Sequence, residues 1–544
     1  MLKRLLGQGY LPHEIPQPFT SSSFGQVVHA NRNRLPGAFS PARITNTKNS
    51  VPGEHNLARV GTLRRTLSIV NPVGHYSLCR EVCESWDEIS QHCANSKLSA
   101  TRPVYRPKGR RAITGTMGLP HRTELRVANR ARGRYLLVTD IQQFYPSVYT
   151  HSIAWALHTK SIAKQKQRDN SLLGNRLDIL QRSSQDRQTM GIPIGPDTSL
   201  VLAEILLTAV DCKLADEVNT ENGFRIVDDY ELVFETYAQA EEALAALQSL
   251  LSQFNLRLNE RKTFITDLPQ SLTRAWTREL RKFEISGSTA DLHEYFDLAF
   301  RLAKEYPLDS VLRYALGRIR RETVSAAVWP DYQYLLCQCA VTEPGVLKYF
   351  LAELRKYKNL GMDLDDTLLT ESLEKIILRH GPIGHGSELA WCLWIACALD
   401  LPIRDSVQDV VLRSDDPLVP IVALDADARG LFGLGFDTTR WRNKMRTDEL
   451  WGPNWLLAYE AAIQGWLPSA TNRDHIAADA AFEFLRANGV SFYNRRASSL
   501  NIPTWSDIVP VPTEFAQQFH VDAILDFGHS GESSYYGDDS DDEF

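Results

Sequence analysis

The feature that most constrains this chain is an apolar run that ends in a carboxylate, within the sequence RYLLVTDIQQFYPSVY of Arg134 to Tyr149. The residues from Tyr135 to Thr139 are aliphatic, aromatic or β-branched, a pattern that predicts a short buried strand. Asp140 follows directly. An ionised carboxylate at the tip of a buried strand is costly unless a cation faces it. The run therefore predicts a strand that delivers a carboxylate to a cation.

A second acidic feature lies in the sequence FRIVDDYELVF of Phe224 to Phe234, where Asp228 and Asp229 separate two apolar runs. This pattern predicts a hairpin with an Asp-Asp turn. Together with Asp140, the pair gives the layout that holds two Mg²⁺ ions for nucleotidyl transfer, with Mn²⁺ as the alternative ion. Aspartates also serve as ordinary solvated turn residues, and that alternative remains open from these residues alone.

Four segments, in order along the chain, resemble the catalytic motifs of reverse transcriptases. LLVTDIQQFYPSVY resembles motif A, RQTMGIPIGPDTS motif B, RIVDDY motif C and FNLRLNERKTFI motif D. The resemblance covers roughly residues 63–276. The sequences FYPSVYTH and GIPIGPDTS are most similar to the corresponding motifs of bacterial abortive-infection and defence-associated reverse transcriptases of unknown-group type. Those enzymes are related to group II intron and retron enzymes.

The resemblance implies roles for particular residues. Asp140, Asp228 and Asp229 would hold the metal ions and act as catalytic residues. Tyr145, five residues after Asp140, would lie under the sugar and exclude a 2′-hydroxyl group. Lys262 in motif D is similar to the residue thought to protonate the departing pyrophosphate.

The nucleotide itself is expected to meet two further segments. Residues 102–111 form a basic turn that can bind a triphosphate or a template backbone, and we select Arg110 and Arg111 there, with a solvated loop as the alternative. In motif B, the nucleotide-binding residues are expected to be Gly191, Pro193 and Gly195.

Two positions depart from the family pattern. Ile226 replaces the usual aromatic residue of motif C, and Ile194 replaces the usual glutamine in the Pro-Gln-Gly of motif B. That glutamine ordinarily contacts the incoming nucleotide, so its loss argues against ordinary template-directed positioning.

The predicted fold class is α+β: right-hand fingers and palm with a ferredoxin-like antiparallel sheet and helices, in the order βαββα then β, followed by a mostly α-helical, HEAT-like repeat domain. Amphipathic helices are expected at 291–303, 346–356, 368–378, 387–399 and 455–465. We divide the chain as follows: 1–56 a flexible N-terminal arm, 57–267 fingers and palm, 268–286 a short thumb-like segment, 287–530 the helical domain, and 531–544 an acidic tail.

Charge and composition are consistent with a nucleic-acid enzyme. Residues 1–200 hold 28 lysines and arginines against 12 aspartates and glutamates, although the whole chain has a net charge of −6. A basic half of this kind favours binding of phosphates. No apolar stretch is long enough to span a membrane, and eight scattered cysteines are typical of a reducing compartment, so we expect a cytoplasmic location and no membrane partner.

The resemblance implies a metal-dependent DNA polymerase of reverse-transcriptase type that acts in antiphage defence. Its expected partners are dNTPs, a DNA product, an RNA template where one is used, and further copies of the chain. Tyr535 and Tyr536, in the flexible tail, are candidate priming residues for protein-primed or template-independent synthesis. Two alternatives remain: a conventional templated reverse transcriptase that copies a cognate RNA, and a non-catalytic nucleic-acid sensor.

Overall fold

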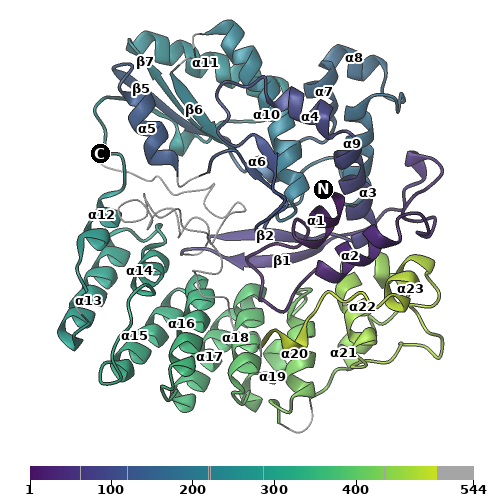
Figure 1. The fold of residues 1–544 in the computed structure, drawn as a ribbon, viewed down its shortest axis with the longest axis vertical. Coiled ribbons are helices and arrows are strands. Elements are labelled where there is room, and N and C mark those ends of the chain that lie inside the picture. The colour runs from purple at the N-terminus through teal and green to yellow at the C-terminus, as the bar shows by residue number, and fades with distance from the viewer. Residues whose placement is uncertain are drawn as a thin grey trace.

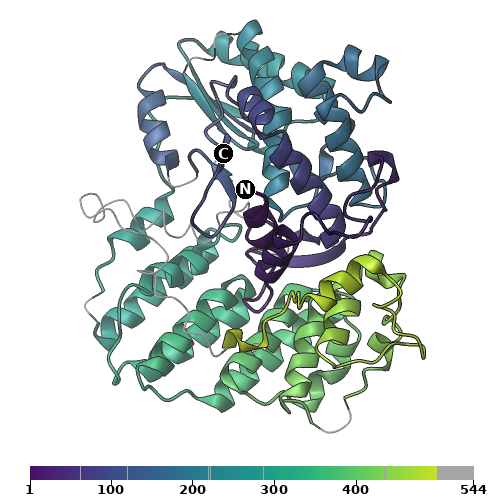
Figure 2. The ribbon, with the colours of Figure 1, turned by 45° about the vertical axis from the view of Figure 1, so that its right-hand side comes forward.

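The structure is a computed structural model that describes residues 1–498, apart from 62, 119–120, 219, 221, 286 and 434–435. Tyr535, Tyr536 and the rest of the tail therefore lie outside the described residues. Figure 1 shows an upper lobe built around a small sheet and a lower lobe made of helices. The earliest part of the chain lies between the two lobes (Figures 1 and 2).

The central sheet of the upper lobe is antiparallel and has four strands in the order β6-β7-β5-β8. These strands are β5 (Tyr135–Asp140), β6 (Gly223–Ile226), β7 (Asp229–Phe234) and β8 (Phe264–Asp267). In the register of the two central strands, Asp140 of β5 lies opposite Asp229 of β7. Pairing alone therefore brings motif A and motif C to the same end of the sheet.

Two long helices pack beside this sheet: α10 (Asp197–Glu217) and α11 (Tyr237–Gln253). The first is apolar over most of its surface and largely buried, while the second begins with a capping box in which Thr236 and Gln239 bond reciprocally. Along the chain the order is β5, helices, β6, β7, α11 and β8, so the predicted order of palm elements is confirmed. Shorter helices join β5 to α10: α6 (Phe144–Ser147), α7 (His151–His158), α8 (Lys160–Gln165) and α9 (Leu173–Ser183).

The fingers contain two hairpins and three helices. The elements are β1 (Gly53–Ala58), β2 (Arg64–Ile69), α3 (Pro72–Glu84), α4 (Trp86–Cys93), β3 (Pro103–Tyr105), β4 (Ile113–Gly115) and α5 (Arg122–Arg130). The expected domain boundary at residue 57 falls within β1, which pairs with β2. The hairpin also contacts the lower lobe, where the Trp455 indole donates to the carbonyl of Ile69 at 2.9 Å.

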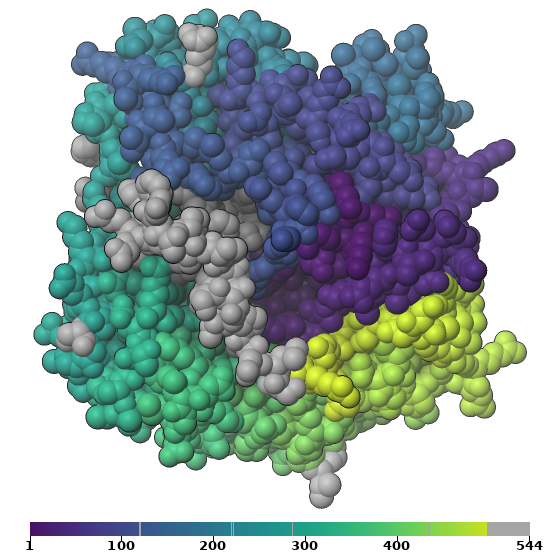
Figure 3. All heavy atoms as spheres, in the orientation of Figure 1, coloured from purple at the N-terminus to yellow at the C-terminus, as the bar shows by residue number. Residues whose placement is uncertain are grey.

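The N-terminal segment is folded, so the prediction of a flexible arm over residues 1–56 is wrong. It contains α1 (Leu2–Gly7) and α2 (Ser22–Ala30), whose apolar side chains Leu5, Leu6 and Phe24 are fully buried. Backbone bonds attach it to the far end of the chain, as where Thr20 donates to the carbonyl of Phe492 at 2.9 Å. Figure 3 shows these purple atoms against the yellow ones of the last helices. The few apolar residues of this segment are stabilised by tertiary contacts that local composition does not reveal.

We expect Leu6→Ala to destabilise the protein by about 2–5 kcal/mol, because it leaves a cavity at a fully buried position. Leu63→Ala is the matched control, since Leu63 is 49% exposed, and should change stability by less than about 0.5 kcal/mol. The measurement is the thermal unfolding of the two variants beside the wild type. Equal melting temperatures for all three proteins would mean that the N-terminal segment is a loose arm after all.

The lower lobe consists of helices that stack in two layers. They are α12 (Ala275–Lys282), α13 (Thr289–Glu305), α14 (Val311–Ile319), α15 (Trp329–Thr342), α16 (Leu347–Asn359), α17 (Asp366–His380), α18 (Gly386–Leu399), α19 (Gln408–Leu412), α20 (Val419–Ala428), α21 (Thr439–Arg442), α22 (Trp455–Ile463) and α23 (Ala480–Ala487). From α13 to α20, each helix contacts the helix two further along the chain. Figure 1 shows the result as a row that follows the chain order. The five helices expected from the sequence are all present in the lower lobe.

Among the described helices, none combines the length and the apolar composition needed to cross a lipid bilayer.

Candidate active site

The acidic residues predicted from the sequence come together at one end of the central sheet. Asp140 ends β5 and Asp228 lies in the tight turn between β6 and β7, and the two residues are 2% and 0% exposed. The turn itself consists of Val227 and Asp228, because Ile226 pairs with Asp229 across the hairpin. The predicted Asp-Asp turn is therefore shifted by one residue, and Asp229 is the first residue of β7.

The turn holds an unusual backbone conformation. Val227 has a φ of +49°, which a β-branched residue rarely adopts. Its N–H donates to the hydroxyl of Thr101 at 2.9 Å, and its carbonyl accepts a bond from the Arg225 guanidinium at 2.7 Å. Strain of this kind persists where surrounding contacts fix it, and it is common at functional sites. Here it fixes the direction in which Asp228 points.

The carboxylates repel one another and have few donors. Neither oxygen of Asp228, nor Oδ1 of Asp140, accepts a hydrogen bond from any described residue. Burial raises the pKa of Asp228 well above its usual range, and the nearby charges of Asp140 and Asp229 raise this pKa further. A buried group in this state is stabilised by a cation, so the donor set fits a hard divalent ion such as Mg²⁺.

The other oxygens near this point are already engaged. Asn259 donates to Oδ2 of Asp140 at 3.1 Å, and the Lys262 ammonium lies 3.5 Å from the same oxygen. Asp229 accepts a 2.8 Å bond from Arg122. The residues that would hold a metal ion are therefore Asp140 and Asp228, with Asp229 beside them. Lys262 does reach the site, whereas the contribution of Asn259 was not predicted.

We expect Mg²⁺ to stabilise the protein more strongly as the pH rises. Because the pKa of Asp228 is higher in the folded state than in the unfolded state, the folded protein binds more protons. Without metal, stability therefore falls as the pH rises from the usual aspartate range through this raised pKa. Mg²⁺ competes with the bound proton, so its stabilising effect should grow over the same range.

Melting temperatures measured with and without Mg²⁺ at several pH values test this expectation. The double variant Asp140→Asn/Asp228→Asn is the control and should show no Mg²⁺ effect at any pH. A Mg²⁺ effect that is independent of pH in the wild type would place the ion elsewhere.

A buried ionic cluster supports the catalytic hairpin from below. The guanidinium of Arg225, which is 0% exposed, lies 3.0 Å from Glu204 and 2.7 Å from Asp211, both on α10. The same side chain also donates to the carbonyl of Val227, as described above. This cluster was missed by sequence reasoning, although two acidic residues seven apart in a mostly apolar helix share one face and could have indicated it.

A stripe of arginines on α5 approaches the same site. Arg122, Arg126 and Arg130 are four residues apart, so they lie on one face of the helix. Arg126 and Arg130 bind the buried Glu231 of β7 at 2.7 and 2.9 Å, and Arg122 reaches Asp229. These contacts hold the helix against the sheet without burying any of its side chains. The stripe was also missed, and its i, i+4, i+8 spacing is the signal that could have revealed it.

The two arginines selected for nucleotide binding have different environments. Arg110 is exposed in the loop between β3 and β4, where a phosphate could reach it. Arg111 is 5% exposed, and its Nε lies 2.9 Å from Asp197, the first residue of α10. It also donates to the carbonyl of Gly195 at 3.1 Å. In this structure Arg111 fixes the start of α10, because its buried charge pairs with Asp197, and its contact with a phosphate remains a prediction.

The motif B loop is covered by the N-terminal segment. Gly191 and Gly195 have φ values of +83° and +133°. A Cβ atom on Gly195 would lie only 2.6 Å from the Cγ of Pro12, and the amide of Asp197 donates to the carbonyl of Gly9 at 2.8 Å. Pro193 is also buried. Gly195 thus faces the chain's own Pro12, which was not expected from the sequence.

Tyr145 lies in α6, directly after the strand that carries Asp140. Its side chain is 1% exposed and packs within the main apolar core, and its carbonyl accepts a 2.9 Å bond from Ile192 of motif B. Motifs A and B are therefore joined at this residue. Its predicted contact with the sugar of a nucleotide remains a prediction.

A basic cavity of about 820 Å³ lies between α7, α8, α9 and residues 45–49. Its lining combines cationic side chains with two aromatic ones: Lys164, Arg168, Arg182, Arg187, Tyr149 and Trp155. Cations beside aromatic rings are typical of surfaces that bind single-stranded nucleic acid.

Comparison with known proteins matches part of the chain to a family. Residues 89–285 match the family model of the reverse transcriptase (RNA-dependent DNA polymerase). No curated protein sequence matches the chain. Among solved structures, telomerase from Candida albicans in complex with a fragment of telomeric RNA is similar over 68% of this chain and 69% of that chain, with 12% identity and a TM-score of 0.26. A likeness of that size supports no inference about fold or function.

Proposed function

We propose a function from one premise: residues 89–285 are a reverse transcriptase domain, so the chain is an RNA-directed DNA polymerase, a nucleotidyltransferase. From this premise we infer a metal-dependent enzyme that builds DNA from dNTPs by an atypical route, in which a protein side chain primes synthesis or no template is used. We further propose that it acts in antiphage defence, as its resemblance to the abortive-infection enzymes implies.

The observation that carries the polymerase proposal is the buried carboxylate of Asp228, which has no described donor and lies beside Asp140 and Asp229. A scaffold protein has no use for mutually repelling buried carboxylates, because their ionised forms are destabilising without a cation. A bound Mg²⁺ would neutralise negative charge on the phosphates during nucleotidyl transfer. The clustered aspartates therefore favour an enzyme over a non-catalytic sensor.

The side chains around the aspartates can perform the remaining tasks. Lys262, 3.5 Å from Asp140, would give a proton to the departing pyrophosphate. Arg110 can attract the triphosphate from its exposed loop. Asn259 and Arg122 orient Asp140 and Asp229 through hydrogen bonds of 3.1 and 2.8 Å.

The atypical route is supported by the region around motif B. Ile194 stands where a glutamine would contact the nucleotide, and Pro12 packs directly on Gly195. The first feature removes a contact with the incoming nucleotide, and the second occupies space beside Gly195. The basic cavity beside α8 supports binding of a single strand at a second surface. Priming by Tyr535 or Tyr536, a homo-oligomeric state and a HEAT-like nature of the helical lobe remain proposals from the sequence.

Tyr145→Ala is expected to raise the use of rNTPs relative to dNTPs, because the ring would no longer exclude a 2′-hydroxyl group. Tyr145→Phe is the matched control and should keep the discrimination, since the ring remains. The measurement is the ratio of rNTP to dNTP incorporation, on variants whose melting temperatures show that they are folded. An unchanged ratio in a folded alanine variant would assign the discrimination to another residue.

Sequencing the nucleic acid that the purified protein binds and synthesises tests the proposed route. Random or homopolymeric DNA made without added RNA would support the proposal, whereas one defined cDNA would indicate a conventional templated enzyme. If a tail tyrosine primes, nuclease-treated protein should carry nucleotides on Tyr535 or Tyr536 by mass spectrometry. Attachment that persists after both are changed to Phe would place the primer elsewhere.

A further inference from the structure

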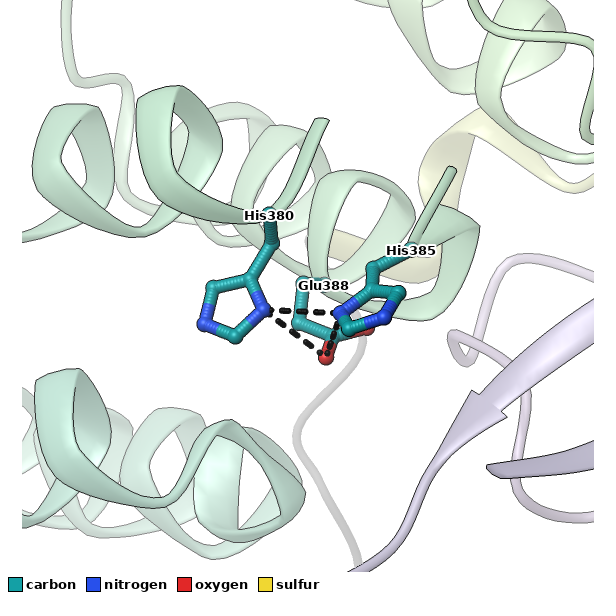
Figure 4. Close-up of side chains that lie close together, drawn as sticks. All are labelled: His380, His385 and Glu388. Atoms are coloured by element: carbon teal, nitrogen blue, oxygen red, sulfur yellow. Dashed lines mark hydrogen bonds and ion pairs between the residues drawn. The ribbon is translucent and has the colours of Figure 1, made fainter. Parts of the chain in front are cut away.

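A cluster of three side chains that could bind a metal ion lies in the lower lobe, far along the chain from the aspartates. His380 ends α17, His385 precedes α18, and Glu388 lies in the first turn of α18. Figure 4 shows the two rings and the carboxylate pointing toward one another. Their side chains are 13%, 18% and 1% exposed, so the cluster is largely buried but accessible to a small ion.

The three nearest atoms form a compact triangle. Nδ1 of His380 lies 3.0 Å from Nδ1 of His385, and these nitrogens lie 3.4 and 3.5 Å from Oε1 of Glu388. Tetrahedral zinc with bonds of about 2.05 Å separates its ligand atoms by about 3.3 Å. Octahedral geometry at the same bond length gives about 2.9 Å. The triangle therefore has the size of one face of a tetrahedral site.

The contact between the two rings also suits a metal ion, because neutral imidazole nitrogens are metal ligands and these two face each other. Without an ion, two nitrogens 3.0 Å apart require one ring to donate its only Nδ1 proton to the other.

A second group holds the carboxylate in place. Arg64 of β2 binds both oxygens of Glu388, at 2.6 and 2.7 Å. Oε1 keeps a second lone pair, which can point toward the two rings. Hydrogen bonds to a metal-binding carboxylate from outside the site orient it, and their loss typically weakens metal affinity by about 10–100-fold.

From this geometry we propose that His380, His385 and Glu388 bind one divalent transition-metal ion of the zinc type, with water as the fourth ligand. Two histidines, one carboxylate and an open position are a donor set that Zn²⁺ accepts. The site is separate from the aspartates of the upper lobe, where the donors are all oxygens and suit Mg²⁺.

The position of this site gives it a structural consequence. Glu388 belongs to the helical lobe and Arg64 to the fingers hairpin, and β1 of that hairpin packs against α18. An ion bound between the end of α17 and the start of α18 would fix the carboxylate of Glu388, which Arg64 binds. The ion would therefore stabilise the contact between the two lobes.

The test uses the full-length chain with Asp140→Asn and Asp228→Asn, which removes the aspartate site from the measurement. This protein is stripped with a chelator, exposed to Zn²⁺ alone, and freed of unbound metal by gel filtration. We expect one Zn²⁺ per chain by elemental analysis, an absorption spectrum typical of tetrahedral coordination when Co²⁺ replaces Zn²⁺, and a higher melting temperature with Zn²⁺. A chain that keeps no Zn²⁺ in stoichiometric amount would overturn the proposal.

Variants locate the ion within the chain. His385→Gln and His380→Gln each remove an Nδ1 ligand and should weaken Zn²⁺ binding at least about 100-fold, more than the loss of an outer hydrogen bond. His293→Gln is the matched control, because His293 pairs with Asp331 at 2.8 Å on the surface and should bind Zn²⁺ as before. Circular dichroism confirms folding. Full Zn²⁺ binding by both histidine variants would also overturn the proposal. Because all these proteins lack the aspartate site, Zn²⁺ binding or its loss is measured independently of polymerase activity.

Discussion

Asp228→Asn is expected to reduce nucleotide incorporation about a thousandfold, while the metal-free variant remains at least as stable as the wild type. Activity is lost because the change removes a carboxylate that would hold the metal ion. The bound ion would stabilise the charge of the transition state by several kcal/mol. Stability is retained because the wild-type carboxylate is buried, has no described donor and is repelled by Asp140 and Asp229. Incorporation of labelled dNTPs and thermal unfolding measure the two effects.

The control for this prediction is Asp267→Asn. Asp267 ends β8 at the opposite end of the same sheet, where it pairs with Tyr135 and is exposed. Both its activity and its melting temperature should match those of the wild type. If Asp228→Asn retained full activity, the palm assignment would be wrong.

Arg225→Met is expected to destabilise the protein by about 3–5 kcal/mol, the largest effect on stability that we predict for a single charged residue. The change leaves the carboxylates of Glu204 and Asp211 buried without their cation, and it removes the bond to Val227. Because that bond fixes the strained turn, activity should fall even at temperatures where the variant is folded. Thermal unfolding and dNTP incorporation are measured on the same preparation.

Arg301→Met is the matched control, since Arg301 makes two ion pairs with its side chain 55% exposed. Exposed ion pairs contribute at most about 1 kcal/mol, so this variant should resemble the wild type. A triple variant with Arg225→Met, Glu204→Gln and Asp211→Asn removes the unpaired charges and should recover part of the lost stability. Similar melting temperatures for Arg225→Met and Arg301→Met would show that the buried cluster does not support the fold.

The sequence predicts the centre of the site well because the chemistry there is local. A strand that ends in Asp140 and a hairpin that carries Asp228 and Asp229 are visible as short patterns, and antiparallel pairing brings them together. The shift of the turn by one residue was not predictable, because it depends on Arg225 and Thr101 holding Val227 at a positive φ.

Features that depend on contacts between distant segments were not predicted. Residues 1–56 resemble a flexible arm in composition, yet Leu5, Leu6 and Phe24 are buried between the two lobes. The basic sequence around Arg111 predicts a phosphate ligand, but the structure pairs Arg111 with Asp197. The role of such a residue is set by partners that the local sequence does not specify.

Nucleotide incorporation by the purified wild-type chain, with labelled dNTPs and Mg²⁺ and with product size resolved on a gel, tests the central claim most directly. The proposed function predicts a DNA product that grows with time, that is lost when a chelator removes Mg²⁺, and that is absent for Asp140→Asn. A folded wild-type protein that binds Mg²⁺ but incorporates no dNTP, with or without added RNA, would contradict it.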